Sequence, residues 1–264
     1  MCGKVMRYDK LLFFFTLFLC SCCGKASGNT EGGEVTPPAP EPSQAVVTAY
    51  VTTADKTLLF KSEELELRKP GTMAVNLVTL DSTVTFQTVD GFGPALTGST
   101  CYNLRAVMEP SARTALLKEL FDPKEGLGFS MVRVTIGSSD FGLDEYTWCD
   151  KKGMENFAAH EYDVRDLFPI LKEVLAINPD VKIIATPWTA PRWMKRRVNN
   201  DSDYYSWTSG RLRSECYQDY AEYFVRWIRV MKSQGFDIYA VTLQNEPLNK
   251  GNSMSMYMPW QEQL

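Results

Sequence analysis

The chain reads Val181-Lys-Ile-Ile-Ala-Thr-Pro-Trp-Thr-Ala-Pro191, a short apolar run that passes directly into a polar loop with two prolines. A short apolar run bounded by such breakers is typical of a strand buried in a parallel sheet. Helical patterns flank it on both sides, one ending before Pro179 and the other ending at Gly235. Strand, loop and helix in this order form the repeating unit of a parallel sheet covered by helices.

Further units of the same kind lie on either side of this stretch. Apolar strands are expected at residues 91–96, 131–136 and 238–243. Ser111 is expected to cap another helix. A (β/α)8 barrel needs eight strands and about 250 residues, which is more than the sequence offers after residue 86. We therefore predict an α/β fold, a TIM barrel truncated after about four βα units, over residues 87–264.

The region before the barrel has a different character. β-Branched residues and short turns dominate residues 45–86, and no helical period appears. We assign this region to β-strands. The expected strands lie at residues 46–52, 57–60, 74–80 and 83–86.

The first residues are interpreted as a targeting segment. Basic residues precede an apolar core, Leu11–Leu19, that is too short to span a bilayer. Leu19-Cys-Ser-Cys22 resembles a bacterial lipobox, so we expect a lipoprotein signal peptide over residues 1–21 and a lipid on Cys22. Residues 22–44 form a Pro/Gly/Ser-rich tether. The protein is then exported and anchored to the bacterial outer membrane or cell surface. An ordinary cleaved signal peptide with incidental cysteines is the alternative.

Charge and composition limit the function classes. Lys and Arg total 28 against 32 Asp and Glu, for a net charge of -4, and 44% of the residues are hydrophobic. That balance is globular and offers no excess of positive charge to bind nucleic acid. Because His160 is the only histidine, a multi-histidine metal site cannot be built, and carboxylates are expected to do any acid–base work. We interpret His160 and Lys195–Arg197 as solvated surface.

The cysteines and tryptophans of the domain carry weaker signals. The cysteines beyond the tether match no zinc pattern, and one disulfide is possible but not required. They are Cys101, Cys149 and Cys216. Three tryptophans are interpreted as mainly structural, with stacking on sugars as the alternative. They are Trp148, Trp193 and Trp207.

The stretch Val241-Thr-Leu-Gln-Asn-Glu-Pro247 carries the candidate chemistry. An apolar strand ends there in two polar residues and a proline, which prevents the strand from continuing. Asn245 and Glu246 are therefore expected at the C-terminal mouth of a strand, where a buried carboxyl can act as a general acid. A glutamate in a solvated strand-to-helix loop is the alternative reading of the same residues.

Four motifs occur in order along the domain. They are Asp90-Gly-Phe-Gly-Pro-Ala-Leu-Thr97, Val132-Arg-Val-Thr-Ile-Gly-Ser-Ser-Asp-Phe141, Thr186-Pro-Trp-Thr-Ala-Pro-Arg-Trp-Met194 and Gln244-Asn-Glu-Pro247. Together they resemble glycoside hydrolase family 30, the glucosylceramidase-like enzymes, and within it most closely the bacterial β-1,6-glucanases. Four ordered motifs over about residues 75–264 are more specific than any single one. The resemblance implies a TIM barrel with a β-sandwich to which the strands before Phe86 contribute.

The resemblance also implies a mechanism with two glutamates and neither metal nor cofactor. Glu246 matches the acid/base of a retaining β-glycosidase, and Asn245 matches a donor to the sugar 2-hydroxyl. Asp140 and Trp188 match positions that bind the terminal glucose. Arg133 matches an arginine beneath the carboxylates. The matching nucleophile belongs after a seventh strand, so we expect it to be absent from this chain and the isolated chain to be inactive.

The leading interpretation is a lipid-anchored retaining β-glycosidase acting on β-1,6-glucan or glucosylceramide-type substrates. Its partners are then a β-glucan or glucoside and, through the anchor, a membrane. A non-catalytic surface lipoprotein that binds glycan is one alternative. An inactive pseudogene product is the other.

Overall fold

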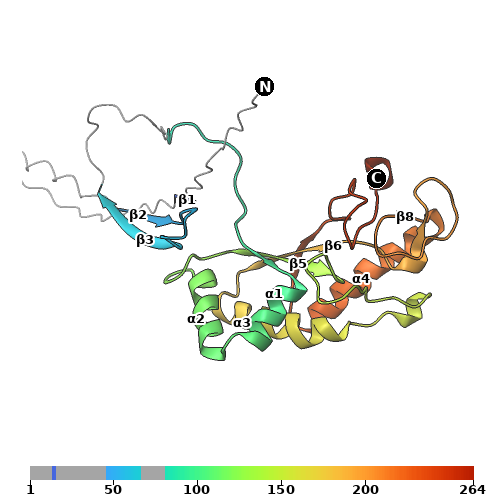
Figure 1. The fold of residues 1–264 in the computed structure, drawn as a ribbon, viewed down its shortest axis with the longest axis horizontal. Helices are drawn as coiled ribbons and strands as arrows, with labels where there is room; N and C mark the ends of the chain where they lie inside the picture. The colour runs from blue at the N-terminus through green and yellow to red at the C-terminus, as the bar shows by residue number, and fades with distance from the viewer. Residues whose placement is uncertain (1–13, 16–45, 67–80) are drawn as a thin grey trace, which may run out of the picture. The chain divides into compact units, whose positions relative to one another are not determined.

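The structure is a computed structural model of the 264-residue chain that describes residues 14–15, 46–66 and 81–264 (Figure 1). The chain divides into one unit over Met1–Thr85 and a second over Phe86–Leu264, and each is described by itself. Cys22, the tether at residues 22–44, the strand expected at 74–80 and most of the signal peptide lie outside the described residues.

The first unit holds a three-stranded antiparallel sheet in the order β1-β2-β3. Its strands are β1 (Phe14–Phe15), β2 (Val46–Val51) and β3 (Lys61–Glu66). β2 confirms the strand expected from residue 46, and it pairs Val47 with Leu65 of β3. β3 was not expected because it reads Lys-Ser-Glu-Glu-Leu-Glu, and charged residues of this kind are depleted in strands.

Two of the expected strands are wrong. The stretch 57–60 belongs to the loop between β2 and β3, where Asp55 Oδ1 accepts a hydrogen bond from the backbone N–H of Thr57 at 3.1 Å. The stretch 83–86 is irregular, and Asp81 Oδ1 accepts one from the N–H of Thr83 at 2.9 Å. Such local side-chain bonds give the backbone an alternative to a strand ladder, and strand propensity alone does not reveal them.

The second unit is built on a four-stranded parallel sheet in the order β4-β5-β6-β9. Its strands are β4 (Ala95–Leu96), β5 (Met131–Ile136), β6 (Lys182–Pro187) and β9 (Ile238–Val241). All of them fall on the apolar stretches predicted as strands, so the α/β class with a parallel sheet is confirmed. A separate antiparallel ribbon pairs β7 (Lys195–Arg196) with β8 (Arg211–Leu212).

Helices connect the strands of the second unit. The α-helices are α1 (Gly98–Tyr102), α2 (Pro110–Phe121), α3 (Phe168–Ile177) and α4 (Tyr217–Ser233). Short π-helical turns lie at Asn103–Val107 and Asp163–Leu167, and 3-10 turns at Met154–Asn156, Arg192–Met194, Ser214–Cys216 and Trp260–Glu262. Helix α2 starts one residue before the expected Ser111 cap, because Pro110 is suited to a first helical turn and Glu109 takes the cap position. Helix α4 ends as predicted, before Gly235 at φ 90°.

The helices lie along one face of the parallel sheet (Figure 1). Val132 and Val134 of β5 are buried in one hydrophobic core with Leu171 of α3 and Trp227 of α4. Successive residues of a strand point to opposite faces. Arg133 therefore points to the face of the sheet that the helices do not cover.

Gly93 explains part of the first motif. A Cβ at this position would lie 1.5 Å from the carbonyl oxygen of Met131, so a side chain is excluded. The glycine lets the chain before β4 approach β5 closely, and β4 then pairs with β5 through Ala95 and Arg133. This part of the motif serves packing.

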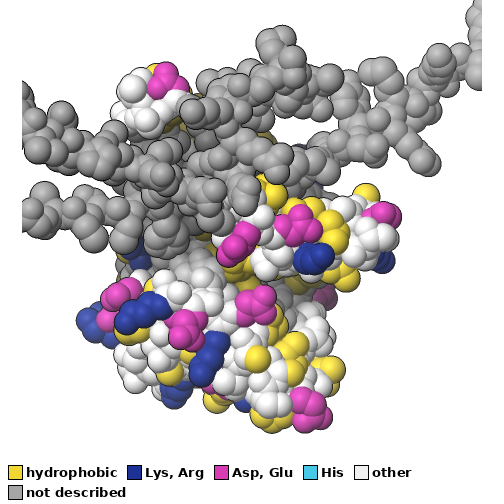
Figure 2. Space-filling model, turned by 90° about the vertical axis from the view of Figure 1, so that its left-hand side faces the viewer, with side chains coloured by type: hydrophobic (Ala, Val, Ile, Leu, Met, Phe, Trp, Pro, Cys, Tyr) yellow, Lys and Arg dark blue, Asp and Glu magenta, His cyan; other side chains and the backbone are white. Residues whose placement is uncertain are grey.

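The surface and the cysteines add three facts about the described residues. On the face in Figure 2, Lys and Arg are interspersed with Asp and Glu. No helix in the described ranges is both long enough and apolar enough to cross a membrane. The cysteines at positions 101, 149 and 216 are buried and unbridged, so the optional disulfide does not form among them.

Candidate active site

The predicted site residues come from the C-terminal ends of neighbouring strands. Arg133 lies on β5, and the loop after that strand carries Asp140. Trp188 directly follows β6, while Asn245 and Glu246 follow β9. The parallel pairing of β5, β6 and β9 brings these strand ends to the same edge of the sheet. Functional groups of α/β barrels gather at this edge.

Arg133 joins the other residues of the cluster. Its Nη2 donates to Asn245 Oδ1 at 2.7 Å, and its guanidinium lies over the Trp188 ring, 4.8 Å from the ring centroid. Burial lowers the pKa of Arg133, and the negative charges of Asp140 and Glu246 oppose this effect. The arginine thus supplies a positive charge at the centre of the cluster.

The contact with Arg133 also fixes the amide of Asn245. The backbone N–H of Asn245 donates to the carbonyl of Pro187 at 2.8 Å, which ties the residue to the end of β6. Because Oδ1 accepts from an arginine, the side-chain NH2 group remains available as a donor. Asn245 can therefore donate a hydrogen bond to a ligand hydroxyl.

Trp188 is held in place by its backbone, and its ring nitrogen is unoccupied. Its side chain is buried, and its carbonyl accepts from Gln244 Nε2 at 2.6 Å. Within the described ranges, Nε1 of Trp188 has no hydrogen-bond partner although it is buried. A buried donor without a partner is costly, so a ligand oxygen at this point would be favoured. Gln244 belongs to the fourth sequence motif, but the sequence did not show that its side chain holds the backbone of Trp188 in place.

Glu246 corrects one expectation. Its side chain is exposed, whereas the sequence predicted a buried carboxyl at the mouth of the strand. It has a left-handed φ of 43°, and its Oε2 accepts a hydrogen bond from Asn249 Nδ2 at 2.6 Å. Asp140 is exposed as well. Both carboxylates are thus accessible to solvent.

Lys195 contradicts the interpretation as solvated surface. It is 1% exposed, and its Nζ donates to Thr189 Oγ1 at 2.9 Å and to the carbonyls of Ser206 and Ser255 at 2.8 and 3.1 Å. Burial, assisted by the positive charge of Arg192, lowers the pKa of Lys195 to about 7. The sequence did not indicate that Lys195 is buried, because two arginines follow it and a run of basic residues is typical of the surface.

The contacts of Lys195 join three separate segments. Thr189 directly follows Trp188, Ser206 lies in the connection to α4, and Ser255 lies in the segment after Glu246. A single ammonium group therefore holds together the loops that carry two predicted site residues. Lys195 is a positioning residue that sequence reasoning missed.

The remaining candidates lie outside this cluster. Trp148 is buried and structural, as interpreted. Trp193 donates from Nε1 to the carbonyl of Cys149 at 2.8 Å, and Trp207 stacks on Arg192. His160 is only partly the solvated residue that was expected: it is half-buried, and its ring stacks on Tyr146 at a centroid distance of 3.7 Å.

Asp163 is a buried carboxyl behind the loop that carries Asp140. It accepts hydrogen bonds from Tyr146 Oη at 2.8 Å and from Trp148 Nε1 at 2.6 Å. Burial raises the pKa of Asp163 to about 7, the negative charge of Asp166 adds to this, and the two hydrogen bonds oppose it. The carboxyl therefore binds a proton near neutral pH in the folded protein and loses it more readily in the unfolded chain.

Stability should depend on pH through Asp163. Since its folded pKa is raised from 3.8, its contribution is full below pH 3.8 and is lost as the pH rises through about 7. We expect Asp163→Asn to remove this loss, so the free energy of unfolding should change less between pH 5 and about 8 than in the unmodified chain. Urea titrations at both values measure it, with exposed Asp237→Asn as the control. Equal pH dependence in Asp163→Asn and the unmodified chain would contradict the assignment.

Potential metal ligands are dispersed in the part of the chain that the structure describes. There, no three His, Cys, Asp or Glu side chains gather closely enough to hold a metal ion. The chemistry of the cluster, with an arginine, an amide, an indole N–H and two exposed carboxylates, suits the binding of hydroxyl groups.

Comparisons with known proteins agree with this arrangement. The sequence profile of the "Glycosyl hydrolase family 30 TIM-barrel domain" matches residues 89–259. An endo-1,6-β-D-glucanase of Neurospora crassa is 33% identical over 229 residues, which cover 80% of this chain and 45% of that protein. The lysosomal acid glucosylceramidase of Mus musculus is 32% identical over 177 residues, covering 65% of this chain and 33% of that protein.

A solved structure gives the same result. The endo-β1,6-glucanase BT3312 superposes with a TM-score of 0.71 at 50% sequence identity, over 84% of this chain and 47% of that one. The chain thus spans less than half the length of each of these relatives. The four parallel strands and their helices correspond to part of the TIM barrel, as the sequence predicted.

Proposed function

This chain belongs to glycoside hydrolase family 30, and from that premise we propose that it supplies the acid/base side of a retaining β-glycosidase that cleaves β-1,6-glucan. Glu246 is the general acid/base. Asn245, Trp188 and Asp140 bind the sugar on the non-leaving side, and Arg133 sets the charge beneath them.

One observation carries this proposal. Arg133 contacts the amide of Asn245 and the ring of Trp188, and its charge is influenced by both Asp140 and Glu246. Residues from three strand ends therefore form one cluster. A retaining mechanism needs a second carboxyl about 5–5.5 Å from the acid/base, which attacks the anomeric carbon. In this proposal the second carboxyl comes from outside the chain.

Within the cleavage step, each residue has a defined task. Glu246 protonates the oxygen of the leaving sugar and then removes a proton from the water that releases the product. The free NH2 of Asn245 donates to the 2-hydroxyl, a contact that strengthens as charge develops at the ring. The unoccupied Nε1 of Trp188 donates to a hydroxyl of the same sugar.

The substrate and the location are part of the proposal. The endo-β-1,6-glucanase structure is 50% identical to this chain, against 32% for the lysosomal glucosylceramidase. We therefore favour β-1,6-glucan over glucosylceramide. We also propose export and lipid anchoring through Cys22, which palmitate labelling of a Cys22→Ser variant would test.

A chimera tests the activity. The 264-residue chain is joined to the remaining C-terminal part of the 50%-identical glucanase, which completes the barrel. We expect the chimera to release reducing ends from β-1,6-glucan and little glucose from glucosylceramide, and the chain alone to release neither.

Four outcomes would contradict the proposal. A folded chimera without product, or one that prefers glucosylceramide, would refute the substrate. Turnover by the chain alone would refute the external nucleophile. Glucan binding without hydrolysis in the folded chimera would favour the non-catalytic glycan-binding protein instead.

A further inference from the structure

A pocket that contains no residue of the Arg133 cluster lies mainly on the connection between β6 and α4. Its volume is about 420 Å³, within the range of about 300–1,000 Å³ that small-ligand sites occupy. Its lining includes Lys152, Arg192, Trp193, Tyr205, Arg213 and Glu215. None of the five residues of the proposed cleavage site lines this pocket, although Lys195, which joins the loops of that site, does. The pocket therefore requires a separate explanation.

Arg192 is the unusual group in this pocket. Its guanidinium lies over the rings of Tyr205 and Trp207, 4.2 and 4.1 Å from their centroids. Among the described residues, its buried Nε has no hydrogen-bond partner. The two aromatic rings fix the plane of a group that is always charged and carries five N–H donors. Within the described residues the guanidinium donates no hydrogen bond at all, so its Nη groups remain available to acceptors of a ligand in the cavity that Arg192 lines.

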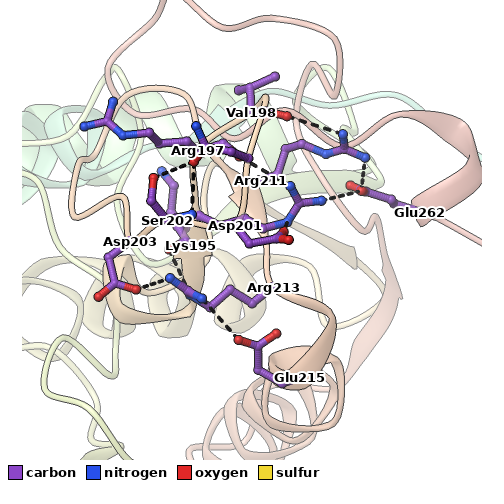
Figure 3. Close-up of polar contacts among 12 residues, drawn as sticks. Lys195, Arg197, Val198, Asp201, Ser202, Asp203, Arg211, Arg213, Glu215 and Glu262 are labelled. Carbon is purple, nitrogen blue, oxygen red and sulfur yellow. Dashed lines mark hydrogen bonds and ion pairs between the residues drawn. The ribbon is translucent and has the colours of Figure 1, made fainter.

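The other charges of the pocket limit the class of ligand. Arg213 pairs with Asp203 and with Glu215, as Figure 3 shows, so its charge is already balanced. Asp219 adds a further carboxylate to the lining, and Lys152 and the buried Lys195 add two basic groups. A phosphate dianion or the carboxylate of a sugar acid only accepts hydrogen bonds, so it could make none with the three carboxylates of the lining, Asp203, Glu215 and Asp219. A hydroxyl both donates and accepts, so it matches the arginine and the carboxylates together.

The aromatic side chains point to a sugar ring. Trp193, Tyr204 and Tyr205 line the pocket. Flat aromatic faces suit the C–H-rich faces of a hexose, while the hydroxyls at the ring edge reach the polar groups. A neutral polyhydroxylated ring therefore suits both the aromatic rings and the mixed charges of the lining.

We propose that the pocket around Arg192 binds a glucose unit of a β-glucan chain, at a second site separate from the one that contains Glu246. The inference rests on the proposed function for the choice of glucan. Arg192 lies on the same loop as Trp188, four residues further along the chain. A polymer held at both sites gains effective concentration at the cleavage site without any change in the chemistry.

The test measures binding and not hydrolysis. The full chain carrying Glu246→Gln is run through native gels that contain soluble linear β-1,6-glucan, and its Kd is also measured by calorimetry with gentiotetraose. We expect Arg192→Leu to weaken the affinity about tenfold or more, since hydrogen bonds from a charged donor are lost. Exposed Arg229 on α4 provides the control, because Arg229→Leu removes the same charge away from the pocket and should change the affinity less than about twofold.

A second variant guards against misfolding. Tyr205 is 60% exposed, so Tyr205→Ala removes one stacking ring with little effect on the core, and it should also weaken glucan binding. Unchanged affinity in Arg192→Leu and Tyr205→Ala would overturn the proposal. Binding of inorganic phosphate or glucuronate through Arg192, with no binding of glucan, would overturn the proposal that the ligand is a neutral sugar.

The two proposals fail separately. If Trp188→Ala abolishes all glucan binding while Arg192→Leu has no effect, the second site is refuted and the cleavage site stands. If Arg192→Leu weakens binding but the chimera hydrolyses nothing, the second site stands and the proposed activity is refuted.

Discussion

Replacing Glu246 by glutamine is expected to lower kcat on β-1,6-glucan by about 10²- to 10⁴-fold in the chimera, the range that general acid catalysis contributes. Glutamine keeps the size of the side chain and the contact with Asn249, but it has no proton to give to the leaving oxygen. Reducing-end assays at saturating glucan measure the effect. Exposed Glu125 provides the matched control, and Glu125→Gln should retain the full rate.

The leaving group separates an acid/base role from a structural one. An aryl glucoside with a dinitrophenyl leaving group needs no protonation, so formation of the glycosyl-enzyme should be affected far less by Glu246→Gln than with glucan. Equal losses on both substrates would mean that the substitution disturbs the site as a whole. Retention of the glucan rate within about twofold would exclude Glu246 as the acid/base.

Replacing Lys195 by methionine is expected to lower the free energy of unfolding by about 2–4 kcal/mol. Methionine fills a similar volume, but Thr189 and the carbonyls of Ser206 and Ser255 lose their shared donor inside the protein. The variant no longer has to bury a charged ammonium group, and this gain offsets part of the loss. The expected decrease in the free energy of unfolding is therefore smaller than the sum of the three hydrogen bonds. Urea unfolding followed by circular dichroism measures it.

The pH dependence gives a second readout for the same variant. The pKa of Lys195 is lowered from 10.5 to about 7 on folding, so its contribution is full above pH 10.5 and is lost as the pH falls to about 7. The free energy of unfolding of the unmodified chain should therefore rise with pH in this window, and Lys195→Met should lack that rise. Exposed Lys172→Met is the control. A stability loss equal to that of the control would show that Lys195 does not join the loops.

Much of the second unit could be predicted because its signals are local. The four strands follow from short apolar runs with breakers, and α4 ends at Gly235 because a glycine favours the left-handed conformation there. Arg133 and Asn245 meet because parallel strands bring their ends to one edge. The resemblance then supplied the roles that spacing alone leaves open.

The failures concern contacts between distant residues or local turns. Asp81 binds the N–H of Thr83 and prevents a strand that propensity favours. Lys195 has acceptors up to 60 residues away, and no periodicity encodes such a contact. The exposure of Glu246 depends on the segments that surround the strand ends, and the motif itself carries no information about them.

The three buried cysteines have a consequence for how the protein reacts with its surroundings. Burial raises the pKa of Cys149 to about 11 and also raises that of Cys101 and Cys216. Only the thiolate reacts with oxidants and alkylating reagents, and little of it forms at neutral pH in the folded state. These three thiols therefore react slowly while the domain is folded, and the rate at which they are modified would report how often the domain opens transiently.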